Sequence, residues 1–110
     1  MSKQRLDFTA EYFKALGSPC RLRIIKELRQ GELTVTQLRD RLQIELPKIS
    51  QELAILKSRQ MVVARKQGIY IYYSCSDPGV FDLLDQARAI IDSRAERAVR
   101  ELEFIGEESE

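Results

Sequence analysis

A short run of polar side chains on one helical face carries the chemistry that this sequence makes most visible. Lys48, Ser50 and Gln51 follow Pro47, which suits the first turn of a helix because its missing N–H is not needed there. Lysine and glutamine side chains can hydrogen-bond to the edges of DNA bases, and serine can reach a base or a phosphate. Ala54, one turn further on, is small enough to let the helix approach another surface closely.

The apolar residues of the same run predict which side of that helix is buried. Ile49, Leu53 and Leu56 fall at helical spacing and form a single apolar stripe. Gln51 then points away from the stripe, where it can make a bidentate contact with adenine, and Lys48 lies on its flank, where it suits a phosphate or a guanine.

The segments around this helix complete a larger motif. Residues 36–42 predict a shorter helix, which Thr34 or Thr36 can cap, and residues 43–46 suit a tight joint between the two helices. Residues 61–63 and 69–73 are rich in strand formers and predict a hairpin with a basic tip. The expected fold is therefore mainly α with a β-hairpin wing, a winged helix-turn-helix whose second helix fits a DNA major groove.

Further side chains of this motif are expected to contact DNA outside the bases. Arg65 and Lys66 of the hairpin should meet phosphate or the minor groove, and Gln67 should assist them. Arg39 and Arg41 of the shorter helix should touch the DNA backbone.

Two segments of the chain resemble signatures of the ArsR/SmtB-type bacterial repressors. These are Ala15–Ile25 and Ile44–Lys57, while Tyr70–Tyr73 is similar to the strand that ends the wing in that family. The resemblance covers roughly residues 8–95. It implies a homodimer that binds a short imperfect palindrome in double-stranded DNA and represses a small operon. Family members often release DNA when an inducer, usually a metal ion, binds.

The residues at the metal sites of the family are different in this chain. Thr34 and Thr36 stand where many metal sensors carry paired cysteines, and threonine is no ligand for a soft metal. The second site of the family uses histidine on the last helix, and this chain has no histidine. Acidic residues there would make at best a weak oxygen-only site, and a solvated acidic face is the simpler interpretation. We expect no metal site and no cofactor, and the sequence does not identify the inducer.

Glu52 is a second departure, because the family often has histidine at that position. A carboxylate that faces DNA phosphates would repel them. Two alternatives follow: Glu52 pairs with Lys48, four residues before it, or it accepts a hydrogen bond from a cytosine amine.

The two cysteines raise the hypothesis of a thiol switch. Cys20 is the second residue of a predicted helix, with Arg21 and Arg23 close by, and a helix N-terminus and guanidinium groups both lower the pKa of a thiol. Cys75 directly follows the wing. Modification of Cys20, with or without Cys75, would alter dimer geometry and DNA affinity. The alternative is a pair of half-buried cysteines with no such role.

The first and last helices predict the way the chain assembles. Residues 6–16 carry a broad apolar stripe, and residues 80–104 carry apolar residues at steps of three and four. So long an amphipathic helix needs a partner, so we expect both helices to pair with their copies across a two-fold axis; the rival is burial within one subunit. Residues 1–105 are expected to form one DNA-binding and dimerisation domain, and residues 106–110 an acidic disordered tail.

Composition limits the remaining function classes. The net charge is only +1, yet residues 14–66 hold twelve Lys/Arg against five Asp/Glu, where the motif requires positive charge. The chain shows no membrane-spanning run and no secretory signal, so we expect a cytoplasmic protein. It has no phosphate-cradling glycine loop and no nucleophile with a visible base, so we expect no enzyme. The alternative to a DNA-binding regulator is a winged-helix protein–protein interaction module that has lost DNA binding.

Overall fold

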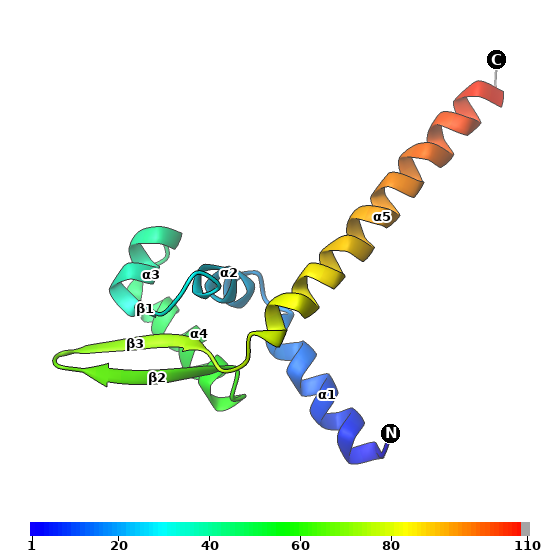
Figure 1. The fold of residues 1–110 in the computed structure, drawn as a ribbon. Coiled ribbons are helices and arrows are strands. Elements are labelled where there is room, and N and C mark those ends of the chain that lie inside the picture. The colour runs from blue at the N-terminus through cyan, green and yellow to red at the C-terminus, as the bar shows by residue number, and fades with distance from the viewer. Residues whose placement is uncertain (109–110) are drawn as a thin grey trace. The chain divides into compact units, whose positions relative to one another are not determined.

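The computed structural model describes residues 1–108, with side chains through Gly106, and divides into two compact units, Met1–Pro78 and a second that begins at Gly79. The elements, in chain order, are α1 (Lys3–Leu16), α2 (Pro19–Leu28), β1 (Leu33–Thr34), α3 (Val35–Leu42), α4 (Leu46–Ser58), β2 (Val62–Gln67), β3 (Tyr70–Cys75) and α5 (Gly79–Glu108) (Figure 1). This is the mainly helical winged helix-turn-helix that the sequence predicts. The last helix, expected to belong to a single domain, forms the second unit by itself.

Short capping signals set where the helices of the first unit begin. The Ser18 hydroxyl accepts the N–H of Arg21 at 3.3 Å, and Pro19 opens α2. At the start of α3, the Thr34 hydroxyl accepts the N–H of Gln37 at 3.1 Å, and the Gln37 side-chain oxygen accepts the N–H of Thr34 at 2.9 Å. This reciprocal pair is a capping box, and Thr34 is therefore the cap.

Three antiparallel strands form the sheet in the order β1-β3-β2. Leu33 pairs with Tyr73 on one side of β3, and Val62 pairs with Cys75 on the other. The pairing runs out to Gln67 opposite Tyr70, so only Gly68 and Ile69 form the loop. Gly68 has a φ of 61°, a conformation that glycine adopts without steric cost.

The core of the first unit lies where α2, α3 and α4 meet the sheet. Leu33 and Val62 are buried from the sheet side, while Val35, which begins α3, is half-buried. The helices contribute the apolar stripes that periodicity predicts: Ile24, Ile25 and Leu28 of α2, Leu38 and Leu42 of α3, and Ile49, Leu53 and Leu56 of α4.

A left-handed residue makes the joint between α3 and α4. Gln43 has a φ of 56°, and its N–H donates to the carbonyl of Arg39 at 2.7 Å. Its side-chain amide also donates to the carbonyl of Asp40 at 2.7 Å. These two bonds satisfy carbonyls at the end of α3 that the helix itself leaves open.

The outer helices are longer than the sequence predicts. α1 begins at Lys3, because the Ser2 hydroxyl accepts the N–H of Arg5 at 3.2 Å and caps it. α5 continues to Glu108, although the sequence predicts a disordered tail from Gly106. Glutamates are good helix formers, and one glycine costs about 1 kcal/mol, which a long helix tolerates. The remaining two residues of that expected tail lie outside the described part. None of the described helices combines the length and apolarity that crossing a bilayer requires.

We predict that Thr34→Ala destabilises the first unit through the loss of the capping box. The expected decrease in the free energy of unfolding is about 1 kcal/mol, measured by urea denaturation. Thr36→Ala is the matched control, because Thr36 belongs to α3 and its side chain is exposed. This variant should change the free energy of unfolding by only a few tenths of the loss expected for Thr34→Ala. Equal losses for the two variants would contradict the assignment of Thr34 as the cap.

Candidate nucleic-acid interface

The outward face of α4 is exposed and carries polar or small side chains. Pro47, Lys48, Ser50, Gln51 and Ala54 are all exposed, as the sequence predicts. The opposite face is fully occupied by the core. The helix is therefore held by one side and presents the other, which is the arrangement that a groove-reading helix requires.

Glu52 is the exception on the buried side, since its side chain is only 5% exposed. Its Oε1 lies 2.8 Å from Nζ of Lys48, and its Oε2 lies 2.8 Å from Nη1 of Arg21. The pairing with Lys48 confirms one of the two sequence alternatives. The contact with a cytosine amine stays a prediction, which the burial of Glu52 and the internal partners of both its oxygens disfavour.

The charges around Glu52 shift the pKa values of both Glu52 and Lys48. The hydrogen bond from Lys48, followed by that from Arg21, holds the pKa of Glu52 below its ordinary value, although burial opposes the shift. The same bond to Glu52 raises the pKa of Lys48. Both groups are therefore charged at neutral pH.

Sequence reasoning missed Arg21 as the second partner. Arg21 Nε donates to the carbonyl of Ala15 at 2.6 Å, so the same guanidinium closes the end of α1 and reaches α4. A signal was available: Glu52 falls within the apolar stripe of α4, between Ile49 and Leu56, and a carboxylate at such a position needs a cation from another element.

Arg65 and Lys66 are not at the tip of the wing, as the sequence suggests, but within β2, opposite Tyr72 and Ile71. The pairing continues past them because the loop needs only Gly68 and Ile69. Successive residues of a strand point to opposite faces, so these two cations cannot face the same side of the hairpin.

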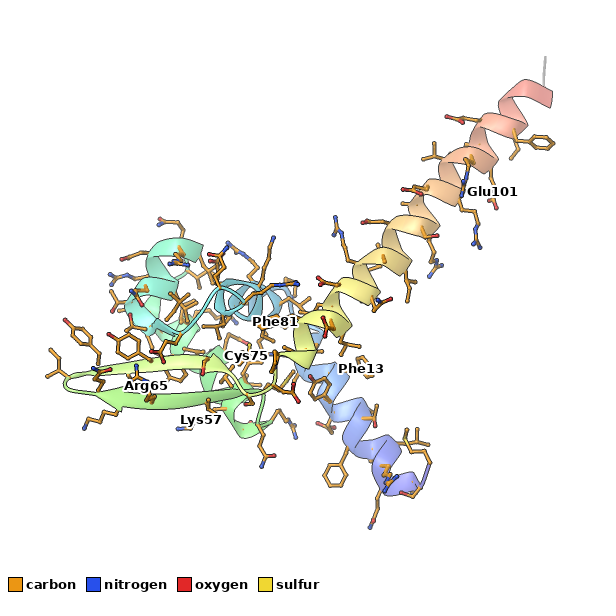
Figure 2. All side chains as sticks on the ribbon, in the orientation of Figure 1. Phe13, Lys57, Arg65, Cys75, Phe81 and Glu101 are labelled. Carbon is orange, nitrogen blue, oxygen red and sulfur yellow. The ribbon has the colours of Figure 1, made fainter. Side chains whose placement is uncertain are left out.

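Arg65 is engaged within the protein. Its guanidinium makes two hydrogen bonds to Glu32, one of them from Nε to Oε2 at 3.1 Å, and a third to Gln67 Oε1 at 2.6 Å. Its Cζ also lies 5.0 Å from the centre of the Tyr72 ring. Figure 2 labels Arg65 on the hairpin of β2 and β3. The bond from Arg65 lowers the pKa of Glu32. These contacts with Glu32, Gln67 and Tyr72 use part of the hydrogen-bonding capacity of Arg65, so its full engagement with DNA requires them to open.

The two arginines of α3 also have acidic neighbours. Arg39 Nε lies 3.0 Å from Asp40 Oδ1, and Arg41 Nη1 lies 3.7 Å from Glu27 Oε2. Both pairs are substantially exposed, and exposed pairs contribute little to stability and exchange readily for other partners. These contacts leave the expected role of Arg39 and Arg41 at the DNA backbone a prediction.

The structure weakens the thiol hypothesis at Cys75. Both cysteines are free and half-buried. Burial raises the pKa of Cys75 to about 11, so its thiol stays protonated and unreactive at neutral pH. Near Cys20, Arg21 is bound to Glu52, and Arg23 donates to the carbonyl of Leu42 at 3.0 Å, so both guanidiniums are engaged elsewhere.

Within the described residues, no group of three or more His, Cys, Asp or Glu side chains is placed to hold a metal ion. Thr34, at one of the positions that carry cysteine in many metal sensors, is used as a helix cap instead.

Comparison with known proteins places this geometry in a family. Residues 18–62 match the family model described as bacterial regulatory protein, arsR family, a span that runs from the cap of α2 to the start of β2. The chain belongs to the ArsR family. It is 36% identical over 83 residues to the transcriptional repressor SmtB homolog of Synechocystis, a match that covers 76% of this chain and 63%, just under two thirds, of that repressor.

Solved structures of ArsR-like regulators agree with the fold. The crystal structure of Rv0081 from Mycobacterium tuberculosis has a TM-score of 0.80 at 30% identity and covers 89% of this chain and 99% of its own. A homodimeric winged helix-turn-helix DNA-binding domain from Mycobacterium bovis has a TM-score of 0.74 at 32% identity and covers 84% of this chain and 88% of its own. The family model describes bacterial regulatory proteins, and the relatives that match are transcriptional regulators.

We predict that the ion pairs of Glu52 make the stability of this ArsR protein depend on pH. Because the pKa of Glu52 is lowered by folding, its contribution is present above the ordinary value of about 4.3 and is lost as pH falls through the folded value. Glu52→Gln should lower the free energy of unfolding by about 1–3 kcal/mol at pH 7, and the difference from the wild type should shrink toward pH 3. Urea denaturation across this range measures it.

Glu45→Gln is the control for that prediction. Glu45 precedes α4, is exposed, and makes no side-chain capping bond. This variant should keep the pH dependence of the wild type. A constant difference between Glu52→Gln and the wild type at all pH values would contradict the role of the Glu52 charge.

Proposed function

We propose that this ArsR protein is a homodimeric repressor that binds a palindromic operator, with α4 of each protomer in a major groove. The observation that carries the proposal is the exposed polar face of α4 over a fully buried apolar face. The positive charge of residues 14–66 lies in the same unit and favours a polyanionic partner.

The side chains of the interface divide into base readers and phosphate contacts. Gln51 and Ser50 read base edges, and Pro47 and Ala54 allow α4 to approach closely. Lys66, exposed on β2, meets phosphate. Arg39, Arg41 and, once released from Glu32, Arg65 with Gln67 add backbone contacts.

Exposed apolar side chains on α1 and α5 support assembly with a second copy. Leu6, Phe8 and Phe13 of α1 are each more than half exposed. α5 exposes a larger set, namely Ile90, Ile91, Val99, Leu102, Phe104 and Ile105. Apolar surface of this extent normally marks an interface, and a two-fold dimer would match a palindromic site. The M. bovis structure is homodimeric, which supports the same assembly here.

The test of DNA binding is its salt dependence. A regulator that meets six or more phosphates should lose ~10³-fold or more in affinity between 50 and 200 mM salt. The wild type first selects a duplex from randomised DNA. Fluorescence anisotropy then measures the affinity for this duplex, and for a scrambled duplex of the same composition, at each salt concentration. A protein–protein interaction module would select no sequence, and a flat salt response would contradict the proposal.

Two substitutions separate the proposed roles. Gln51→Ala should weaken binding to the selected duplex about tenfold or more and leave the scrambled duplex nearly unchanged. Lys66→Gln should weaken both and reduce the salt slope by about 0.9 for each protomer of the dimer. Lys3→Gln, which removes the same charge from the start of α1, should leave both affinities within about twofold of the wild type.

A thiol response is the second part of the proposal, and Cys20 is its candidate, since Cys75 is held protonated. Oxidant should weaken DNA binding of the wild type, and Cys20→Ser should abolish that response while Cys75→Ser retains it. Gel shift before and after mild oxidant, with mass spectrometry of each thiol, measures the outcome. An unchanged oxidant response in Cys20→Ser would end this part of the proposal.

A further inference from the structure

Among the residues that the structure describes, Glu52 is the one buried charged residue. Each of its carboxylate oxygens has its own cation, Lys48 on Oε1 and Arg21 on Oε2, at 2.8 Å in both cases. No buried side-chain nitrogen or oxygen in the described residues lacks a hydrogen-bond partner. We call Arg21, Glu52 and Lys48 the Glu52 cluster; both oxygens of its carboxylate are satisfied within the protein.

One end of this cluster is fixed by the fold. The Arg21 side chain is only 17% exposed, and it also donates to the carbonyls of Ala15 at 2.6 Å and Lys14 at 3.4 Å. Arg21 is thus held between the end of α1 and the side of α4. Arg21 therefore orients the Glu52 carboxylate independently of Lys48.

The other end of the cluster faces solvent. Lys48 is 53% exposed, lies one helical turn before Glu52, and stands on the flank of the face that carries Gln51. A lysine ammonium has three N–H donors, and one of them is used by Glu52. The other two project from an ammonium that the contact with Glu52 restrains, whereas an unpaired lysine would sample many rotamers.

We propose that Glu52 is a positioning residue that determines specificity, because it fixes Lys48 as an oriented donor to a base edge. The acceptor chemistry is that of guanine O6 and N7 in the major groove. This inference rests on the proposed function of α4 as the DNA-reading helix.

The pairing with Glu52 reduces the effective charge of Lys48 but keeps its hydrogen-bond donors. The carboxylate of Glu52, shared between Lys48 and Arg21, offsets part of the charge of Lys48, so this lysine attracts phosphates less strongly than an unpaired lysine would. Its directional hydrogen bonds remain. Non-specific affinity is thereby held down while discrimination between bases is kept, and the ratio of the two is what a regulator needs in a genome of competing sites.

The decisive measurement is the ratio of affinities for the selected and the scrambled duplex. Glu52→Gln keeps the shape and an acceptor for Arg21 but removes the charge that holds Lys48. For each protomer, we expect the salt slope for the scrambled duplex to steepen by about 0.9 and the ratio of affinities to fall about tenfold. The affinity for the scrambled duplex should rise severalfold. Glu45→Gln removes the same charge near the start of α4, and should raise both affinities while keeping the ratio.

Lys48→Met tests the other partner and leaves the Arg21–Glu52 pair in place. It should also lower the ratio about tenfold. The double variant Lys48→Met, Glu52→Gln restores the net charge of the wild type. We expect its scrambled-duplex affinity to be near that of the wild type and its ratio to equal that of either single variant, because both changes remove the same contact.

Three results would overturn the inference: an unchanged ratio in folded Glu52→Gln, an unchanged ratio in Lys48→Met, or additive losses in the double variant. Circular dichroism of each variant establishes folding, and if Glu52→Gln does not fold, Lys48→Met alone decides. A wild type that selects no sequence would instead refute the proposed function, so the two failures are distinguishable.

Discussion

A buried carboxylate is the constraint on which the position of the recognition helix depends. Removing a carboxylate from water without partners costs several kcal/mol, so α4 can pack with Glu52 inward only where cations meet it. Arg21 supplies the inner cation and at the same time closes the end of α1. The orientation of α4 therefore depends on two supports. One is the apolar stripe beneath it, and the other is the Arg21 guanidinium, which connects α4 to the end of α1.

The paired charges also change how the composition of the chain should be interpreted. Residues 14–66 have a large excess of cations, but four of the five acidic residues there form ion pairs with cations of the same segment. These acidic residues are Glu27, Glu32, Asp40 and Glu52, and their partners are Arg21, Arg39, Arg41, Lys48 and Arg65. The fifth, Glu45, precedes α4. The positive surface available to DNA is thus smaller and more localised than a charge count indicates.

Local patterns made much of the fold predictable, and contacts between distant segments made the rest unpredictable. The stripe of α4, the cap and proline of α2 and the hairpin follow from spacing within a few residues. The pairs Arg21–Glu52 and Glu32–Arg65 join residues 31 and 33 positions apart, and no local pattern specifies which elements meet. The predicted position of Arg65 and Lys66 at the tip of the wing is wrong for a local reason. The loop has only two residues, Gly68 and Ile69, so the strands extend past both cations and place them on opposite faces.

The joint at Gln43 has a consequence for the mechanical coupling of the two motif helices. Glycine is the usual residue at a left-handed helix end, and it leaves the unfolded and native chains free to explore many backbone angles. A glutamine held there by its own amide has far fewer alternatives. α3 and α4 should consequently move as one stiff body, so that a displacement of either helix is transmitted to the other without being absorbed at the corner.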